Sequence, residues 1–327
     1  MYQRPSLFYE TSQPFKRDIQ KSADKHNKSL EEDTSMDKRI AVLVVTYNRK
    51  KYLKENIEAV LNQSYSNLNL IICDNNSTDG TGELVEKYMA RDKRIKYFNT
   101  GENLGGAGGF SYGLKYVYGQ EYDYCWIMDD DAVPEKDALK SLTESADRLP
   151  IHSFSFLAST VLWTDHTPCY MNKPTIETEK IYKNLEFAKN GLVPIESCSF
   201  VGCFVDLHYG RMVGLPIKEF FIYGDDSEYT LRLSEKCQGF LDTGSIIIHK
   251  MGVNAKLGIA EAPEDRIERY VYDYRNQVYI SRYRKQEKGR KLFVRYLKES
   301  IKVLLRSKGK KARRIMVIWK GYREGKS

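Results

Sequence analysis

The sequence lacks any apolar run that approaches the roughly 18 residues a membrane-spanning helix needs. Its first twenty residues, MYQRPSLFYETSQPFKRDIQ, also lack the apolar centre of a secretion signal. We therefore expect neither an integral membrane protein nor a protein secreted by the usual route.

Paired cysteines are also missing. The chain has 6 cysteines but no Cys-x-x-Cys pair and no Cys/His knuckle of the kind that holds structural zinc. Most of them lie in apolar stretches, so we expect reduced thiols in the core of a cytoplasmic protein. No internal repeat and no low-complexity tract is evident.

What is present is a globular composition. Of the 327 residues, 41% are hydrophobic and 29% are charged. This length fits one large α/β domain with an appendage, or two small domains. Residues 1–37 are polar and show no periodicity, so we expect a mobile or loosely docked arm there. We expect the main domain at residues 38–285 and a basic helical tail at residues 286–327.

Positive charge is concentrated at the C-terminal end. Residues 282–327 contain 18 Lys and Arg against 3 Asp and Glu, whereas the rest of the chain contains 34 against 41. Such asymmetry predicts a tail that contacts an anionic surface. Because the tail carries no recognisable nucleic-acid-binding motif, nucleic acid is not the expected partner.

Short apolar runs alternate with segments of helical period in the first half of the chain. This order predicts an α/β fold, with a doubly wound and mostly parallel sheet flanked by helices. The second half mixes strands and helices less regularly. Strands are expected at residues 40–46, 68–73, 95–98, 124–128, 154–162, 197–207 and 245–249, and helices at 50–62, 80–90, 110–118, 226–236 and 266–284.

Polar residues follow three of the predicted strands, at the edge where open α/β sheets bind ligands. They are TYNR at residues 46–49, DNNS at 74–77 and DDD at 129–131. A helix cap alone explains DNNS equally well. Polar ends on three strands together favour a binding site.

The run Asp129-Asp130-Asp131 follows an apolar strand, and adjacent buried carboxylates repel one another unless a cation lies between them. Alternate residues of an extended strand point the same way, so Asp129 and Asp131 can share one ion while Asp130 faces elsewhere. Carboxylate oxygens suit Mg²⁺ or Mn²⁺, ions that usually bridge substrate phosphates. The alternative is a solvated acidic turn before the next helix.

A glycine-rich run, NLGGAGGF at residues 103–110, follows the third strand. Such a run lets the backbone approach a ligand and points amides at it from a helix N-terminus. It matches neither a P-loop nor a clean G-x-G-x-x-G fingerprint, so a plain loop is equally compatible.

A second acidic cluster, DDSE at residues 225–228, follows an apolar FFIY and opens a predicted helix. Carboxylates that emerge from an apolar wall are good candidates for a general base. Helix capping explains Asp225 or Asp226, but not both together with Glu228. His249 ends an apolar strand and is either a satisfied histidine at the core edge or, beside the expected cation, a third ligand.

Taken in order, these motifs resemble glycosyltransferase family 2. They are VTYNR, DNNS, NLGGAGGF, WIMDDD, YGDDSEY and the later His249, and the resemblance covers roughly residues 38–285. The combination is most similar to the galactofuranosyltransferase and rhamnosyltransferase branch. Arg275-Asn276 also looks like this branch, but the sequence suggests no physical role for the pair beyond lining the cleft. The long N-terminal β-domain of some galactofuranosyltransferases does not precede the first strand here.

The resemblance implies a GT-A fold and an inverting, Mn²⁺- or Mg²⁺-dependent hexosyl transfer. The implied reaction moves galactofuranose from UDP-galactofuranose to a lipid-linked or polysaccharide acceptor in bacterial cell-surface glycan synthesis. It implies a metal site at Asp129, Asp131 and His249. It further implies Asp226 as the base, acceptor contacts at Asp225 and Glu228, and donor contacts at Thr46, Arg49, Asp74, Asn76, Asn103, Gly105, Gly106 and Asp130.

Three other interpretations stay open. A rhamnosyltransferase using dTDP-rhamnose fits the motifs nearly as well. A sugar-1-phosphate nucleotidyltransferase has a related core, but it requires a glycine-rich loop and a basic residue directly after the first strand, where this chain has TYNR. The third is a non-catalytic nucleotide-sugar binder, which the retained carboxylates and His249 argue against. Any of these proteins could form a homo-oligomer.

The tail contains two basic amphipathic segments, at residues 290–306 and 310–319. We expect the first to lie in the interface of an anionic membrane, which makes the protein peripheral at the inner face of the cell membrane. The alternative is that these helices pack on the catalytic domain with their lysines solvated. The apolar residues expected on one side of the first segment are Leu292, Phe293, Leu297, Ile301, Leu304 and Leu305.

Overall fold

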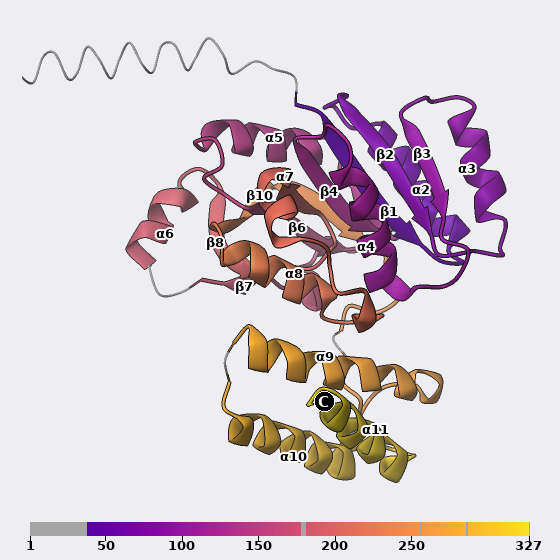
Figure 1. Cartoon of the computed structure of the whole chain (residues 1–327), viewed down its shortest axis with the longest axis vertical. Coiled ribbons are helices and arrows are strands. Elements are labelled where there is room, and N and C mark those ends of the chain that lie inside the picture. Colours follow the sequence, from indigo (N-terminus) through magenta and orange to yellow (C-terminus); the bar gives the residue numbers. More distant parts are fainter. Residues whose placement is uncertain (1–37, 178–180, 256, 286, 327) are drawn as a thin grey trace, which may run out of the picture. The chain divides into compact units, whose positions relative to one another are not determined.

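The computed structural model describes residues 38–177, 181–255, 257–285 and 287–326, and Figure 1 shows their elements. The arm expected at residues 1–37 lies outside these ranges. Residues 38–327 cluster as one unit. Within the described ranges, none of the helices combines the length and the apolar character that crossing a bilayer requires.

The first half of the fold is the predicted parallel sheet. Its strands are β1 (Ile40–Thr46), β2 (Leu68–Asp74), β3 (Ile95–Asn99) and β4 (Tyr124–Asp129), in the order β3-β2-β1-β4. Each of the 7 residues of β1 is buried, as expected of a β-branched strand covered on both faces. The connecting helices are α2 (Lys50–Leu61), α3 (Thr81–Met89) and α4 (Gly105–Tyr118).

Helix α4 begins five residues earlier than predicted, so most of the glycine-rich run is helical. The glycines allow α4 to lie close to the sheet. A Cβ atom on Gly109 would lie 2.6 Å from Val45 Cγ1, and one on Gly113 would lie 2.4 Å from Leu43 Cδ1. The run is thus required at least in part for packing against β1.

The second half extends the sheet beyond β4 in the order β9-β6-β10-β8-β7, and β9 pairs antiparallel with β4. The single strand predicted at residues 197–207 is wrong, because β8 ends at Ser197 and β9 begins at Cys203. Gly202, with φ of +84° and no room for a Cβ beside Ile247, turns the chain between them. The bounds are β6 (Phe156–Trp163), β7 (Thr175–Ile176), β8 (Leu192–Ser197), β9 (Cys203–Asp206) and β10 (Gly239–His249).

A short strand, β5 (Ala132–Pro134), pairs antiparallel with β10. In this register His249 lies opposite Ala132, the residue that follows the three aspartates. This pairing was not predicted, and it determines the geometry of the candidate site. The remaining helices of this half are α5 (Ala138–Arg148), α6 (Ile181–Ala188), α7 (Leu207–Val213) and α8 (Asp225–Ser234).

The C-terminal helices α9 (Tyr270–Tyr283), α10 (Gly289–Arg306) and α11 (Lys311–Glu324) share an apolar cluster of their own. One side of α10 therefore packs on protein, including Leu292, which was expected on the membrane-facing side. The adjoining side of α10 exposes an apolar stripe, which we call the α10 stripe. Its residues are Phe293, Leu297, Ile301, Leu304 and Leu305.

A buried ion pair joins α8 to the end of α9. Glu228 is 0% exposed, and its carboxylate accepts hydrogen bonds from Arg232 Nε at 3.0 Å and Arg284 Nε at 2.8 Å. A buried carboxylate is tolerated only with such partners, so each of the three residues depends on the others.

We expect Glu228→Gln to lower the free energy of unfolding by about 3–5 kcal/mol, because it leaves two guanidinium groups without their carboxylate. Urea unfolding followed by circular dichroism measures this loss. Glu235→Gln is the matched control, since Glu235 also pairs with Arg284, at 3.6 Å, but is half exposed. It should cost at most about 1 kcal/mol. Equal losses in the two variants would contradict the assignment.

Candidate active site

The ends of β1, β2 and β4 meet as the sequence predicted. Thr46 pairs with Asp74 across β1 and β2, and Val45 pairs with Asp129 across β1 and β4. The polar residues that follow these three strands therefore share one edge of the sheet, where open α/β sheets bind ligands.

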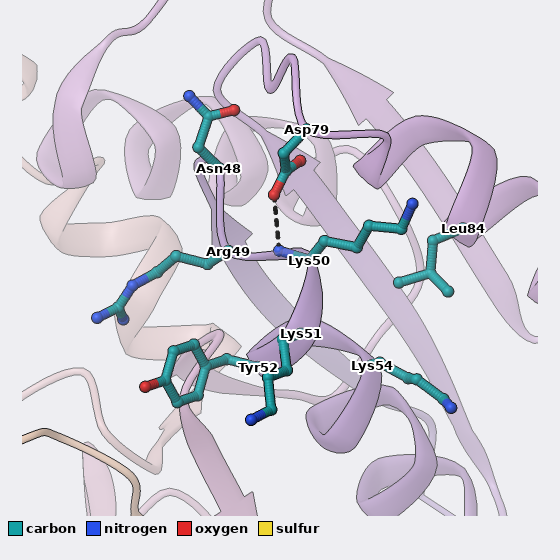
Figure 2. A pocket seen from close by; sticks show the side chains of 8 residues that line it. All are labelled: Asn48, Arg49, Lys50, Lys51, Tyr52, Lys54, Asp79 and Leu84. Carbon is teal, nitrogen blue, oxygen red and sulfur yellow. Dashed lines mark hydrogen bonds between the residues drawn. The ribbon is translucent and has the colours of Figure 1, made fainter.

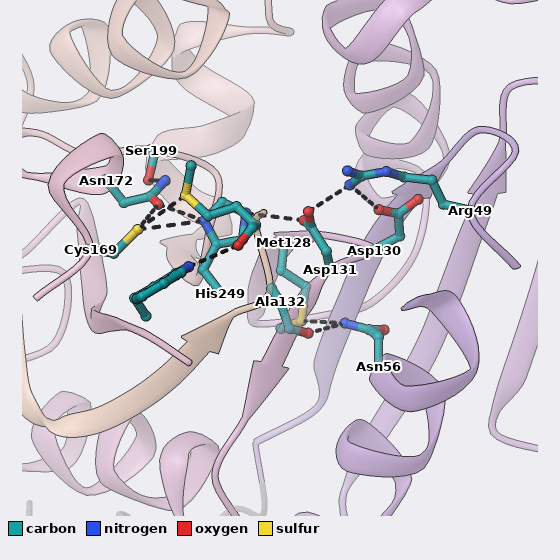
Figure 3. A network of polar contacts seen from close by, with 12 residues as sticks. Arg49, Asn56, Met128, Asp130, Asp131, Ala132, Cys169, Asn172, Ser199 and His249 are labelled. Carbon is teal, nitrogen blue, oxygen red and sulfur yellow. Dashed lines mark hydrogen bonds and ion pairs between the residues drawn. The ribbon is translucent and has the colours of Figure 1, made fainter. Parts of the chain in front are cut away.

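Asp129, Asp131 and His249 come together at this edge. One ligand atom from each lies within 4.8 Å of the others, and His249 Nε2 is 3.1 Å from Asp131 Oδ1. Figure 3 shows His249 and Asp131 facing each other, with Arg49 on the far side of the aspartates. The pairing of β5 with β10 brings His249 there, across 118 residues of sequence.

The pKa values of this cluster reflect crowded charge away from water. Desolvation, followed by the charge of Asp131, raises the pKa of Asp129 to about 7. Desolvation acts in the same direction on Asp131, but the hydrogen bond from His249 and the contacts with Arg49 lower its pKa to about 2. Burial disfavours the charged form of His249, yet its hydrogen bond to Asp131 raises its pKa to about 10.

These residues fit a divalent cation. Among the described residues, no side chain or backbone amide donates a hydrogen bond to the Asp129 carboxylate, which lies beside a second carboxylate. Two carboxylates and an imidazole are ligands that Mn²⁺ accepts, and Mg²⁺ favours the oxygens. Binding would displace the proton on His249 Nε2, because only the deprotonated nitrogen ligates.

Asn172 orients the histidine, and sequence reasoning missed it. Its Oδ1 accepts a hydrogen bond from His249 Nδ1 at 2.7 Å, and its Nδ2 donates to Ser199 Oγ at 2.9 Å. A metal-ligating histidine commonly has such a partner on its other nitrogen. Asn172 lies in a poorly periodic stretch, so no sequence signal indicated it.

Asp130 is not part of the metal cluster, but strand alternation is not the reason, because β4 ends at Asp129 and both Asp130 and Asp131 lie in the turn after it. Asp130 accepts hydrogen bonds from Thr46 Oγ1 at 2.8 Å and Arg49 Nη1 at 3.1 Å, and burial raises its pKa to about 6. Arg49 also donates to Asp131 Oδ2 at 2.6 Å. Thr46, Arg49 and Asp130 are thus one hydrogen-bonded group beside the predicted metal ligands.

Arg49 also borders a basic cavity of about 680 Å³. Figure 2 shows lining side chains on the first turns of α2, and half of the lining residues, Lys50, Lys51, Tyr52 and Lys54, belong to this helix. A cavity with several cations attracts anionic groups. Its lysines, Lys50, Lys51 and Lys54, were not predicted from the sequence.

The other side chains predicted to contact the donor, Asp74, Asn76 and Asn103, differ in their exposure to solvent. Asp74 is 0% exposed, and its carboxylate accepts hydrogen bonds from the Ser77 hydroxyl at 2.6 Å and the Tyr97 hydroxyl at 2.7 Å. These contacts hold the turn after β2 and leave Asp74 no exposed atom for a nucleobase. Asn76, at φ of +66°, and Asn103 are exposed at the same edge.

The two glycines predicted to contact the donor also differ in their surroundings. A Cβ on Gly105 would lie 2.2 Å from Phe221 O, so this position is closed by protein. A Cβ on Gly106 would meet nothing within 4 Å. Gly106 is therefore the position of the pair where a ligand can approach the backbone.

The second acidic cluster lies near the first. Asp225 is 8% exposed, and burial, followed by the charges of Asp226 and Asp129, raises its pKa well above the usual range. The charge of Asp226 likewise contributes to the raised pKa of Asp129. Asp226 is more exposed than Asp225. Glu228 points elsewhere, into its ion pair with Arg232 and Arg284, so its observed contacts are structural rather than acceptor-facing.

Comparison with known proteins agrees with this geometry. The family model "Glycosyl transferase family 2" matches residues 41–209. "Glycosyltransferase GlyG" of Streptococcus pneumoniae is 34% identical over 108 residues, which are 33% of this chain and 35% of that protein. "Galactofuranosyltransferase GlfT1" of Mycolicibacterium smegmatis is 25% identical over 258 residues, covering 74% of this chain and 82% of that one.

A solved structure shares the fold. The crystal structure of GalNAc-T7 with UDP, GalNAc and Mn²⁺ superposes with a TM-score of 0.56 at 11% identity, over 78% of this chain and 53% of that chain. The sheet order, the helices on its faces and this likeness identify the predicted GT-A fold. The chain spans little more than a third of the length of the first curated relatives that it matches. The family model, however, covers half of this chain, and the chain therefore belongs to glycosyl transferase family 2.

Proposed function

We propose that the protein is an inverting, divalent-metal-dependent glycosyltransferase that moves a sugar from a nucleoside diphosphate to an acceptor hydroxyl. The observation that carries this proposal is the meeting of two acidic clusters at one sheet edge. Asp129, Asp131 and His249 form the first, and Asp225 and Asp226 form the second. One cluster suits a metal and diphosphate, and the other suits proton removal.

The reaction is a single displacement. The acceptor oxygen bonds to the anomeric carbon as the bond from that carbon to the diphosphate oxygen breaks, and the acceptor proton passes to Asp226. When bound by Asp129, Asp131 and His249, Mn²⁺ or Mg²⁺ supplies positive charge that stabilises the leaving diphosphate. Arg49 forms ion pairs with Asp130 and Asp131, and we propose that its positive charge serves the same diphosphate.

UDP-galactofuranose is the donor that we propose. The similarity to a galactofuranosyltransferase over most of both chains supports it, as does the motif set. The alternative donor is dTDP-rhamnose. We further propose that the acceptor is a lipid-linked or polysaccharide glycan of the bacterial cell surface.

A panel of nucleotide sugars, incubated with the protein and Mn²⁺, tests the function through released nucleoside diphosphate. We expect release with UDP-galactofuranose and its loss in chelator. Asp131→Asn should reduce turnover by at least about 10²-fold and weaken Mn²⁺ binding, because it removes one charged ligand. Full activity of Asp131→Asn in the presence of a chelator would contradict the metal-dependent mechanism.

Asp226→Asn should lower turnover by at least about 10²-fold while donor affinity stays near that of the wild type, because only proton removal is lost. Initial rates and donor titrations separate the two quantities. Asp225→Asn is the matched variant one residue away. If it were inactive while Asp226→Asn kept full turnover, the two roles would be exchanged.

We also propose that the α10 stripe binds an anionic membrane, holding the enzyme at the inner face of the cell membrane beside its acceptor. Leu305 is 79% exposed and Leu304 is 52% exposed on this side of α10. A basic groove lined by Lys291, Arg295 and Lys298 lies on the same helix. Each basic residue near an anionic surface contributes about 1 kcal/mol to binding.

The paired change Leu304→Glu and Leu305→Glu should reduce cosedimentation with phosphatidylglycerol vesicles by at least about tenfold, because it places charge in the apolar stripe. Added salt should weaken binding of the wild type through screening. Met212→Glu is the control, at a residue that is 58% exposed on α7. If the paired variant bound vesicles as well as the wild type does, the proposal would be contradicted and α10 would have a packing role alone.

A further inference from the structure

The loop that leads into Asp225 and Asp226 is strained. In this loop, residues 220–224, Phe221 has φ of +61° and ψ of −55°, and the Ile222 amide donates to Phe220 O at 2.7 Å. This is a γ-turn of the rare positive-φ type. Tyr223 follows at φ of +70° and Gly224 at +81°. Bulky residues avoid this region, so the surrounding structure must hold the loop.

Asn276 of α9 holds it. Its Nδ2 group donates to the carbonyl oxygens of Phe220 at 3.0 Å, Ile222 at 3.1 Å and Tyr223 at 2.8 Å. Asn276 is 1% exposed, so these bonds are shielded from water. Its own Oδ1 accepts from Arg275 Nε at 3.0 Å, which fixes the amide orientation.

Other contacts support the same arrangement. Arg275 Nη2 also donates to Phe220 O, at 3.2 Å. Aromatic rings of the loop pack on tyrosines of α9, with Phe221 stacked on Tyr272 at 5.0 Å between centroids and Phe220 edge-on to Tyr279 at 5.5 Å.

Helix α4 closes the loop from another side. The Ala107 amide donates to Phe221 O at 3.2 Å, and a Cβ on Gly105 would lie 2.2 Å from that same oxygen. The backbone of the loop is therefore fixed by the glycine-rich start of α4 and by Asn276. Asp225 and Asp226 follow immediately, so their direction depends on both contacts.

We infer that Asn276 is a positioning residue that sets the catalytic carboxylates in place through the backbone of residues 220–224. The inference rests on the proposed function, because it takes Asp226 as the group that removes the acceptor proton. An amide is required there, since three carbonyl oxygens converge on one donor group. A carboxylate of the same shape would repel all three.

The test compares Asn276→Asp, which keeps the shape and removes the donor, with Gln277→Ala on the exposed side of the same helix. Turnover of Asn276→Asp should fall by at least about tenfold, since small displacements of a catalytic group are costly. Its donor KM and Mn²⁺ affinity should stay within about twofold of the wild type. Amide hydrogen exchange should speed up in residues 220–228 and remain unchanged in β1 and β4. Gln277→Ala should match the wild type throughout.

Three results would overturn the inference. They are wild-type turnover in Asn276→Asp, unchanged exchange in residues 220–228, or faster exchange across the whole protein with loss of donor binding. Asn276→Ala provides a second variant if Asn276→Asp fails to fold, with the same expected split between turnover and KM. If the wild type releases no diphosphate from any donor, the proposed function fails, and hydrogen exchange alone then decides whether Asn276 holds the loop.

Discussion

The burial of like charge at the end of β4 is the constraint on which the rest of the site depends. An apolar strand delivers three consecutive aspartates to the sheet edge, two of them nearly inaccessible to water. Such an arrangement is unfavourable unless positive charge and hydrogen-bond donors surround it. Arg49, Thr46 and His249 provide them. Thr46 and Arg49 come from the end of β1 and the residues just after it, whereas His249 comes from the distant end of β10.

The same constraint explains why the site is asymmetric. Asp130 and Asp131 have protein partners, whereas Asp129 accepts no hydrogen bond from the described residues, and its pKa of about 7 is the highest of the three. Asp131 thus anchors the group, and Asp129 is the carboxylate most in need of a cation. The proposed transfer from a nucleotide sugar agrees with this division, because it requires positive charge where the diphosphate departs.

The second acidic cluster depends on a different kind of support. Its direction is set by a strained loop, and the loop is held by a buried amide and by a helix that can approach only because it begins with glycine. The glycine-rich run and Arg275-Asn276 are far apart in the sequence, yet they hold the same backbone. This gives a physical reason for the small residues at the start of α4 and the buried polar residue in α9.

The sequence by itself determined the parallel half of the sheet, because β-branched runs and helical periods are local patterns. The family resemblance also indicated that DDD and His249 belong to one site. The sequence could not determine the β8–β9 break, the β5–β10 pairing, or the contacts of Asn172 and Asn276, which join segments up to 118 residues apart. It also assigned Glu228 to the acceptor, whereas tertiary structure buries it between two arginines. A carboxylate shows its role only when its partners are known, and those partners are brought to it by packing rather than by neighbouring sequence.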